Sequence, residues 1–185
     1  MAQMLLVVAA LTILSMLTFT VNSSILQAYV ISYDSEATID AMSIGQAMLD
    51  EIQTQAFDSL TNTTQTVKNP NLCTIPSKLG ADIDSEKTFA SVVAVYPDTM
   101  PFKSMEKFND VDDYNRYKRL VKSPHLGNFT VEDSVSYVLD SDLNTPYKIT
   151  PTWYKKVLVK ISHPSLYRPI EMKSLIVFRK YFGHP

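Results

Sequence analysis

An acidic segment is the part of this chain whose residue types best suit cation binding. The stretch KFNDVDDYNRYKRL, residues 107–120, gathers several side-chain oxygens within a few positions, at Asn109, Asp110, Asp112, Asp113 and Asn115. Hard cations such as calcium take about six to eight oxygen ligands. Asp110, Asp112 and Asp113 are therefore candidate ligands of a weak calcium site.

The same segment has a second interpretation. It lacks the glycine and the terminal glutamate of an EF-hand loop, so that motif is excluded. A solvated acidic loop would use its carboxylates to cap neighbouring backbone N–H groups. It would also pair them with the basic side chains that follow, Arg116, Lys118 and Arg119.

Other arrangements of reactive residues are missing from the sequence. The single cysteine, Cys73, excludes an intramolecular disulfide, and the three histidines are scattered in turn-like contexts. No Ser/His/Asp order or phosphate-binding loop occurs. The formal net charge is -2, without a broad basic face. We expect no enzymatic activity, no cofactor apart from the candidate calcium, and no nucleic-acid partner.

Three Asn-x-Ser/Thr triplets offer acceptors for glycosylation in an exported protein, at Asn22, Asn62 and Asn128. Asn62 and Asn128 fall in predicted loops and are the better acceptors. Asn22 would lie within a helix.

The N-terminal part of the chain, which must hold these candidate residues in place, begins with an apolar helix. Residues 4–21, MLLVVAALTILSMLTFTV, contain no charge, glycine or proline, and the first charged side chain is Asp34. At 1.5 Å per residue this segment spans about 27 Å, close to the hydrocarbon thickness of a bilayer. A secretory signal is disfavoured, because no basic residue precedes the run and no helix break follows it. A charged leader removed ahead of Met1 would explain the missing basic flank.

The helical periodicity continues well past the apolar run. One helix over residues 4–60 would be about 85 Å long. Small and apolar residues recur at steps of three or four on one face, at Ala37, Ala41, Ile44, Met48, Ile52, Ala56 and Leu60. The acidic residues of this segment, Glu51 and Asp58 among them, are expected to face water. The apolar half-helix, residues 1–28, is thus distinguished from a globular domain, residues 29–185.

The remainder of the chain indicates a loop-rich connection and then strands. Residues 61–87 are rich in turn formers, and strands are expected over residues 88–96, 131–139, 153–162 and 170–182. The last two should form a hairpin with a long loop. The fold class is therefore α+β, with a protruding apolar half-helix and an amphipathic half packed on three to four antiparallel strands.

Three features give the chain a resemblance to the type IV pilin and pseudopilin superfamily. They are the apolar residues 4–21, the continuation EATIDAMSIGQAMLDEIQTQAFDSL, and the phrase FNDVDDYN, which is most similar to minor pilins of the mannose-sensitive haemagglutinin type. The resemblance implies a pilin-like fold, a clipped leader and storage in the inner membrane. Assembly machinery there would then build an extracellular filament on the cell surface, from copies of this chain or other pilins.

One residue departs from the family pattern. Leu5 stands where family members usually carry a glutamate that neutralises a neighbour's terminal amine. Gln3 or a hydroxyl such as that of Thr12 would have to serve instead, or the mature start differs from Met1.

The expected assembly interface is the apolar half-helix, which would leave lipid and enter the filament centre. Its residues are Met4, Leu5, Val8, Leu11, Leu14, Ser15, Thr18, Val21 and Ile25. The leading hypothesis is a structural filament subunit. The alternatives are a monomeric, membrane-anchored binding module and a pseudopilin of a secretion system.

Overall fold

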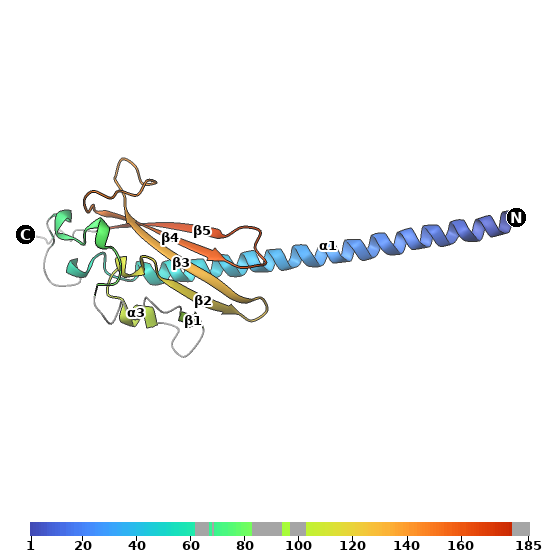
Figure 1. The fold of residues 1–185 in the computed structure, drawn as a ribbon, viewed down its shortest axis with the longest axis horizontal. Helices are drawn as coiled ribbons and strands as arrows, with labels where there is room; N and C mark the ends of the chain where they lie inside the picture. Colours follow the sequence, from blue (N-terminus) through green and yellow to red (C-terminus); the bar gives the residue numbers. More distant parts are fainter. Residues whose placement is uncertain (62–66, 68, 83–93, 97–102, 179–185) are drawn as a thin grey trace, which may run out of the picture.

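The protein consists of one long helix and a five-stranded sheet that covers only the helix's second half (Figure 1). The computed structural model describes residues 1–61, 67, 69–82, 94–96 and 103–178. Helix α1 (Ala2–Gln53) is about 78 Å long at 1.5 Å per residue. Its first thirty or so residues, 1–33, project from the domain as a stem, and only the last turns of this stem lie beside the loop at residues 164–167 (Figure 1).

Helix α1 ends earlier than its periodicity predicts. The Thr54 hydroxyl donates to the Glu51 carbonyl at 2.7 Å, and the Ala56 carbonyl accepts the Val111 amide at 2.9 Å. The chain therefore leaves the helix to pair with the acidic segment. The expected helix over residues 4–60 is wrong in its last turns, and Leu60 is exposed on a short helical turn at Ser59–Thr61.

The sheet order is β1-β2-β3-β4-β5. Strands β2 (Lys118–Ser123), β3 (Gly127–Tyr137), β4 (Tyr154–Ser162) and β5 (Ile170–Val177) form an antiparallel meander. This confirms the α+β class, with a long N-terminal helix on a four-stranded antiparallel sheet. Strand β1 (Ala94–Tyr96) pairs in parallel with β2, which the sequence did not indicate.

The strand boundaries differ modestly from those expected. Strand β3 begins at Gly127 and therefore includes Asn128, which was expected in a loop but remains exposed. Strand β2 was not predicted at all. Most of residues 88–96 and the last residues of 170–182 lie outside the described residues, as does Asn62.

The core forms between α1 and one face of the sheet. Alternate residues of β3 and β4 point inward, as period-two burial requires, and meet a narrow stripe of α1. The stripe consists of Ala37, Ala41, Gly45, Met48, Leu49 and Ile52. A Cβ at Gly45 would lie only 2.8 Å from Ile161 Cδ1, so glycine lets the helix approach the sheet closely.

An aromatic cluster closes the core beside the acidic segment. Phe108, Tyr114 and Tyr117 meet edge to face, with ring centroids 4.8 to 5.9 Å apart. All three are buried. Aromatic pairs in this geometry add stability beyond their area burial, so the segment that carries the acids is fixed firmly against the sheet.

Candidate functional site

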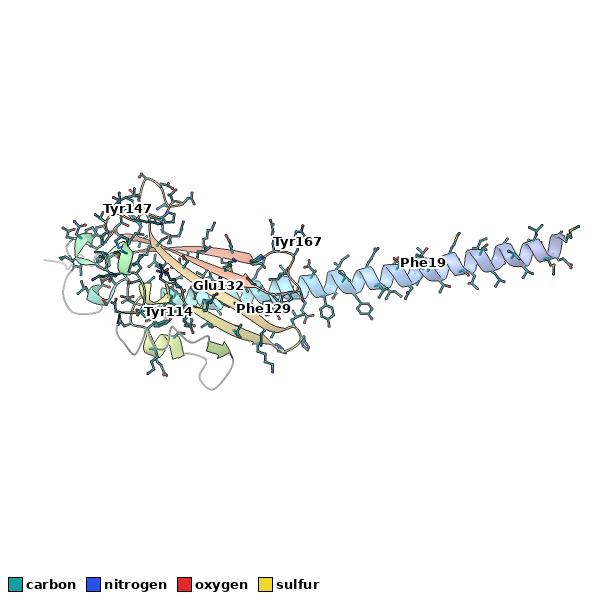
Figure 2. The ribbon with its side chains drawn as sticks, in the orientation of Figure 1. Phe19, Tyr114, Phe129, Glu132, Tyr147 and Tyr167 are labelled. Atoms are coloured by element: carbon teal, nitrogen blue, oxygen red, sulfur yellow. The ribbon has the colours of Figure 1, made fainter. Side chains whose placement is uncertain are left out.

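The stem is the most unusual surface of this chain. Its large apolar side chains are all exposed, from Met4 at 79 % to Ile25 at 49 %, and none of its apolar window is buried. Figure 2 shows these side chains, with Phe19 labelled, radiating from the helix with no other element near them. The helix is long and apolar enough to cross a membrane, as a membrane anchor or a signal sequence would.

Hydroxyl side chains on the stem are satisfied within the helix itself. Thr18 and Thr20 donate to the carbonyls four residues earlier at 2.9 and 2.8 Å, and Thr12 donates to Ala9 at 2.8 Å. Ser24 does the same with Thr20. Because these four protons already have acceptors, these hydroxyls can enter a nonpolar environment without becoming unpaired donors.

The structure places every predicted assembly residue on the exposed stem. Met4, Leu5, Val8, Leu11, Leu14, Ser15, Thr18, Val21 and Ile25 all lie in α1 and all are exposed. Apart from Leu5, they recur at steps of three or four residues, so they lie along one face of the helix. Their role in assembly stays a prediction.

A second candidate site lies buried beyond the other end of α1. Asp58, Asp110 and Asp112 each offer a carboxylate oxygen, and these three atoms lie within 4.8 Å of one another. All three residues are fully buried. Asp58 follows the helix, while Asp110 and Asp112 come from the acidic segment. The triad could hold a metal ion, since carboxylate oxygens are the donors that hard cations prefer.

A lysine already supplies positive charge to this triad. Lys155 of β4 is fully buried, and its Nζ donates to Asp112 Oδ1 and to the Phe57 carbonyl, each at 2.5 Å. Asp58 Oδ2 lies 3.5 Å from the same nitrogen. The ammonium also faces the Phe57 ring at 4.6 Å and the Tyr137 ring at 5.4 Å. Any bound cation would therefore compete with Lys155.

Asp110 is the carboxyl of this cluster that binds a proton and so loses its negative charge. Burial, and then the neighbouring Asp112, raise the pKa of Asp110 to about 9. Its Oδ2 atom and that of Asp112 have no hydrogen-bond partner among the described residues. At neutral pH Asp110 is consequently protonated, and the two unpartnered oxygens are the atoms available to a cation that displaces this proton.

Asp113 does not join the triad. Its Oδ2 accepts the backbone N–H groups of Asn109 and Asp110, at 2.9 and 3.3 Å, so it shapes the turn. The expectation of capping carboxylates is met here, but that of a solvated loop is wrong, because Asp110, Asp112 and Asp113 are buried. Among the basic side chains, Lys118 pairs with Glu132 and Arg119 with Glu51.

A buried ion pair between α1 and the sheet was also missed. Glu51 Oε2 accepts from Arg119 Nη1 at 2.7 Å, and Glu51 Oε1 accepts from the Tyr114 hydroxyl at 3.1 Å and from Ser104. Glu51 and Asp58 were expected to face water and are buried instead. Their partners are distant in sequence, so helical periodicity held no signal for them.

Two other reactive groups among the described residues, Cys73 and His163, form no further site. Cys73 is buried, and burial together with Asp58 raises the pKa of its thiol to about 12, so it stays protonated. His163 is used structurally, with its ring stacked on Phe129 and Nε2 hydrogen-bonded to the Leu126 carbonyl.

No family model, curated protein or solved structure matches this chain. The exposed stem and its domain are therefore the features on which a proposal of function rests.

Proposed function

We propose that this protein is a structural subunit of an extracellular, type IV pilus-like filament on the cell surface, which polymerises through its stem. Before assembly the stem would hold the subunit in the inner membrane, where assembly machinery would receive it. The observation that carries this proposal is the exposure of the stem, where large apolar side chains from Met4 to Leu26 have no covering element. Such a surface requires lipid or other chains around it.

Identical stems are suited to cover one another. Residues 1–33 carry no charged side chain, so packing one stem on another places no side-chain charge in the bundle. Ala9, Ala10 and Ser15 are small and exposed, which permits close approach of backbones. The internally bonded threonine hydroxyls add no unpaired donor.

The domain agrees with what the pilin resemblance implies. One helix is exposed in its first half and packed on an antiparallel sheet in its second half (Figure 1). Bundled stems would then place the domains on the outside of a filament. This arrangement supports a pilin-like subunit over a compact soluble domain.

A charge in the stem tests the proposal. Leu14→Asp should abolish filaments seen by electron microscopy while the domain stays folded, because a carboxylate in a nonpolar bundle costs about 3 kcal/mol per subunit. Ser43→Asp is the matched control, since it places the same charge on an exposed position of α1 beside the domain. It should assemble normally. Filaments of Leu14→Asp at the wild-type level would refute the proposal.

A membrane-anchored monomeric binding module is the second candidate, favoured because the stem is apolar on every side. Replacing residues 1–24 by an unrelated transmembrane helix separates the two functions. An anchor tolerates the exchange and stays monomeric in detergent, whereas a filament subunit loses assembly. A secretion pseudopilin would behave like the filament subunit, because it also assembles through its stem.

A further inference from the structure

An apolar groove lies where the stem enters the domain. It has a volume of about 730 Å³. One wall is the loop between β4 and β5, at Pro164 to Tyr167, and the other is α1, at Tyr29, Val30, Ile31, Tyr33 and Asp34. Tyr167, at the tip of that loop, is 99 % exposed. Figure 2 shows Tyr167 beside the stem, at the opposite end of the domain from Tyr147. Three tyrosines, Tyr29, Tyr33 and Tyr167, thus gather at one level of the molecule.

This level coincides with the edge of a bilayer that contains the stem. Counting back from Asp34, the neutral stem is about 50 Å long at 1.5 Å per residue. A bilayer with its headgroups is about 40 to 45 Å thick, and spanning helices tilt by about 20°. Tyr29 and Tyr33 therefore fall in or beside one headgroup layer. Tyrosine is enriched there because its ring is apolar and its hydroxyl is polar.

The loops beside the groove carry charges that suit phosphate. The β2–β3 turn and the β4–β5 loop point toward the stem in Figure 1 and are joined by the His163–Leu126 hydrogen bond. Within residues 122–128 and 163–169 the charged side chains are Lys122 and Arg168, both exposed, and no acid occurs. On α1, Asp34 borders the groove, while Asp40 is held by the Ser123 hydroxyl at 2.6 Å.

We propose that this end of the domain rests in the phospholipid headgroup layer while the subunit waits in the membrane. Tyr29, Tyr33 and Tyr167 act as interfacial anchors, and Lys122 and Arg168 face the lipid phosphates. The groove then takes up lipid, and the loop between β4 and β5 fixes the height of the domain above the bilayer. The proposal rests on the membrane-held stage of the proposed function.

Tryptophan reporters at three heights test this placement. Phe19→Trp, Tyr167→Trp and Tyr147→Trp are each made in full-length Trp153→Phe, which keeps an aromatic ring against Phe178. Each protein is reconstituted at low density into phosphatidylcholine and phosphatidylglycerol vesicles. These carry a nitroxide either on the headgroup or deep in the acyl chain. Fluorescence quenching reports which layer each position contacts.

We expect each tryptophan to respond differently to the two nitroxides, according to its height. Phe19→Trp should be quenched several-fold more by the acyl-chain nitroxide, Tyr167→Trp several-fold more by the headgroup nitroxide, and Tyr147→Trp by neither. Quenched Phe19→Trp with unquenched Tyr167→Trp would overturn the proposal and assign the groove to protein, such as the stem of another copy. Unquenched Phe19→Trp would overturn the membrane-held stage itself. Filament formation by Leu14→Asp is scored separately and does not depend on these outcomes.

Discussion

Lys155 combines the roles of an ion-pair partner and a packed core side chain. Its ammonium contacts Asp112 and the Phe57 carbonyl, and two aromatic rings enclose its remaining surface. The carboxylates that surround it could hold a metal ion, so its charge and that of a cation are alternatives at one place. Removing the lysine should therefore reveal whether the triad has affinity for a cation.

Lys155→Met should lower stability by about 3 to 5 kcal/mol, since it leaves buried carboxylates without their cation. Calcium should raise the melting temperature of this variant more than that of the wild type. The exposed Lys173 on β5 provides a matched Lys173→Met control, which should change neither stability nor calcium response. Thermal unfolding with and without calcium measures both. If Lys155→Met melts at the same temperature with and without calcium, the aspartate triad does not bind calcium.

Asp133 is a buried carboxyl on β3 whose charged form is disfavoured in the folded protein. Burial raises its pKa well above the ordinary value, with Arg119 opposing the shift, and neither carboxylate oxygen has a hydrogen-bond partner among the described residues. A group whose pKa is higher in the folded state stabilises below its unfolded pKa and loses that contribution as pH rises through its folded pKa. The native protein should accordingly lose stability as the pH rises above about 4.

Asp133→Asn should flatten this pH dependence and raise stability at pH 7. The gain is at most about 4 kcal/mol, the free energy of protonating an ordinary carboxyl at that pH. Denaturant unfolding across the pH range measures it. Asp142→Asn, in an exposed turn where a hydrogen bond with Thr145 lowers the aspartate pKa, should give no gain at pH 7. Equal behaviour of the two variants would mean that Asp133 is ionised in the folded protein.

At the scale of elements, two charged contacts attach α1, and the chain that follows it, to the sheet. Glu51 on α1 pairs with Arg119 on β2, and Asp58 beyond the helix end lies near Lys155 on β4. Apolar contacts are non-directional, so the stripe alone fixes the position of the helix along the sheet less strictly than a charged contact does. A buried ion pair fixes one register, since any displacement leaves both charges unpaired.

Adjacent positions on β2 allow a direct test. Arg119→Met should cost about 3 to 5 kcal/mol by leaving Glu51 buried and unpaired. Lys118→Met removes an exposed partner of Glu132 and should cost less than about 1 kcal/mol. Urea unfolding compares the two variants. Similar losses at both positions would show that the Glu51–Arg119 pair does not fix the helix.

The sequence predicts elements where periodicity is local and misses them where distant contacts decide. The alternation in β3 and β4 and the stripe from Ala37 to Ile52 were correctly expected, because burial on one face leaves that pattern. Strand β2 was missed because KRLVKS is short and mostly polar. The last turns of the expected helix were wrong because Ala56 pairs with the acidic segment instead.

The candidate site shows the same division. Asp110 and Asp112 were expected as cation ligands, since they lie two residues apart in one segment. Asp58 and Lys155 come from other elements, and only the fold brings them to the triad. The apolar character of the stem was recognised from the sequence, because composition needs no tertiary partner, although its end was placed at residue 28 instead of 33.

At the scale of the whole molecule, the domain and the stem have opposite requirements. The buried part of α1 begins at Ala37, so the domain is complete without the stem, and the stem makes no contribution to the core. An apolar surface of this size is uncommon on a monomer in water. Solubility, membrane residence and assembly should all depend on residues 1–33, and stability on the remainder.

The continuity of α1 has a mechanical consequence. The helix contains no proline, and its single glycine is clamped beneath β4 and β5, so it offers no hinge between stem and domain. A pull along the stem is therefore transmitted to the sheet without slack. The Glu51–Arg119 pair and the contacts of Lys155 join α1 and the chain after it to the sheet, so they should bear that load together with the apolar stripe.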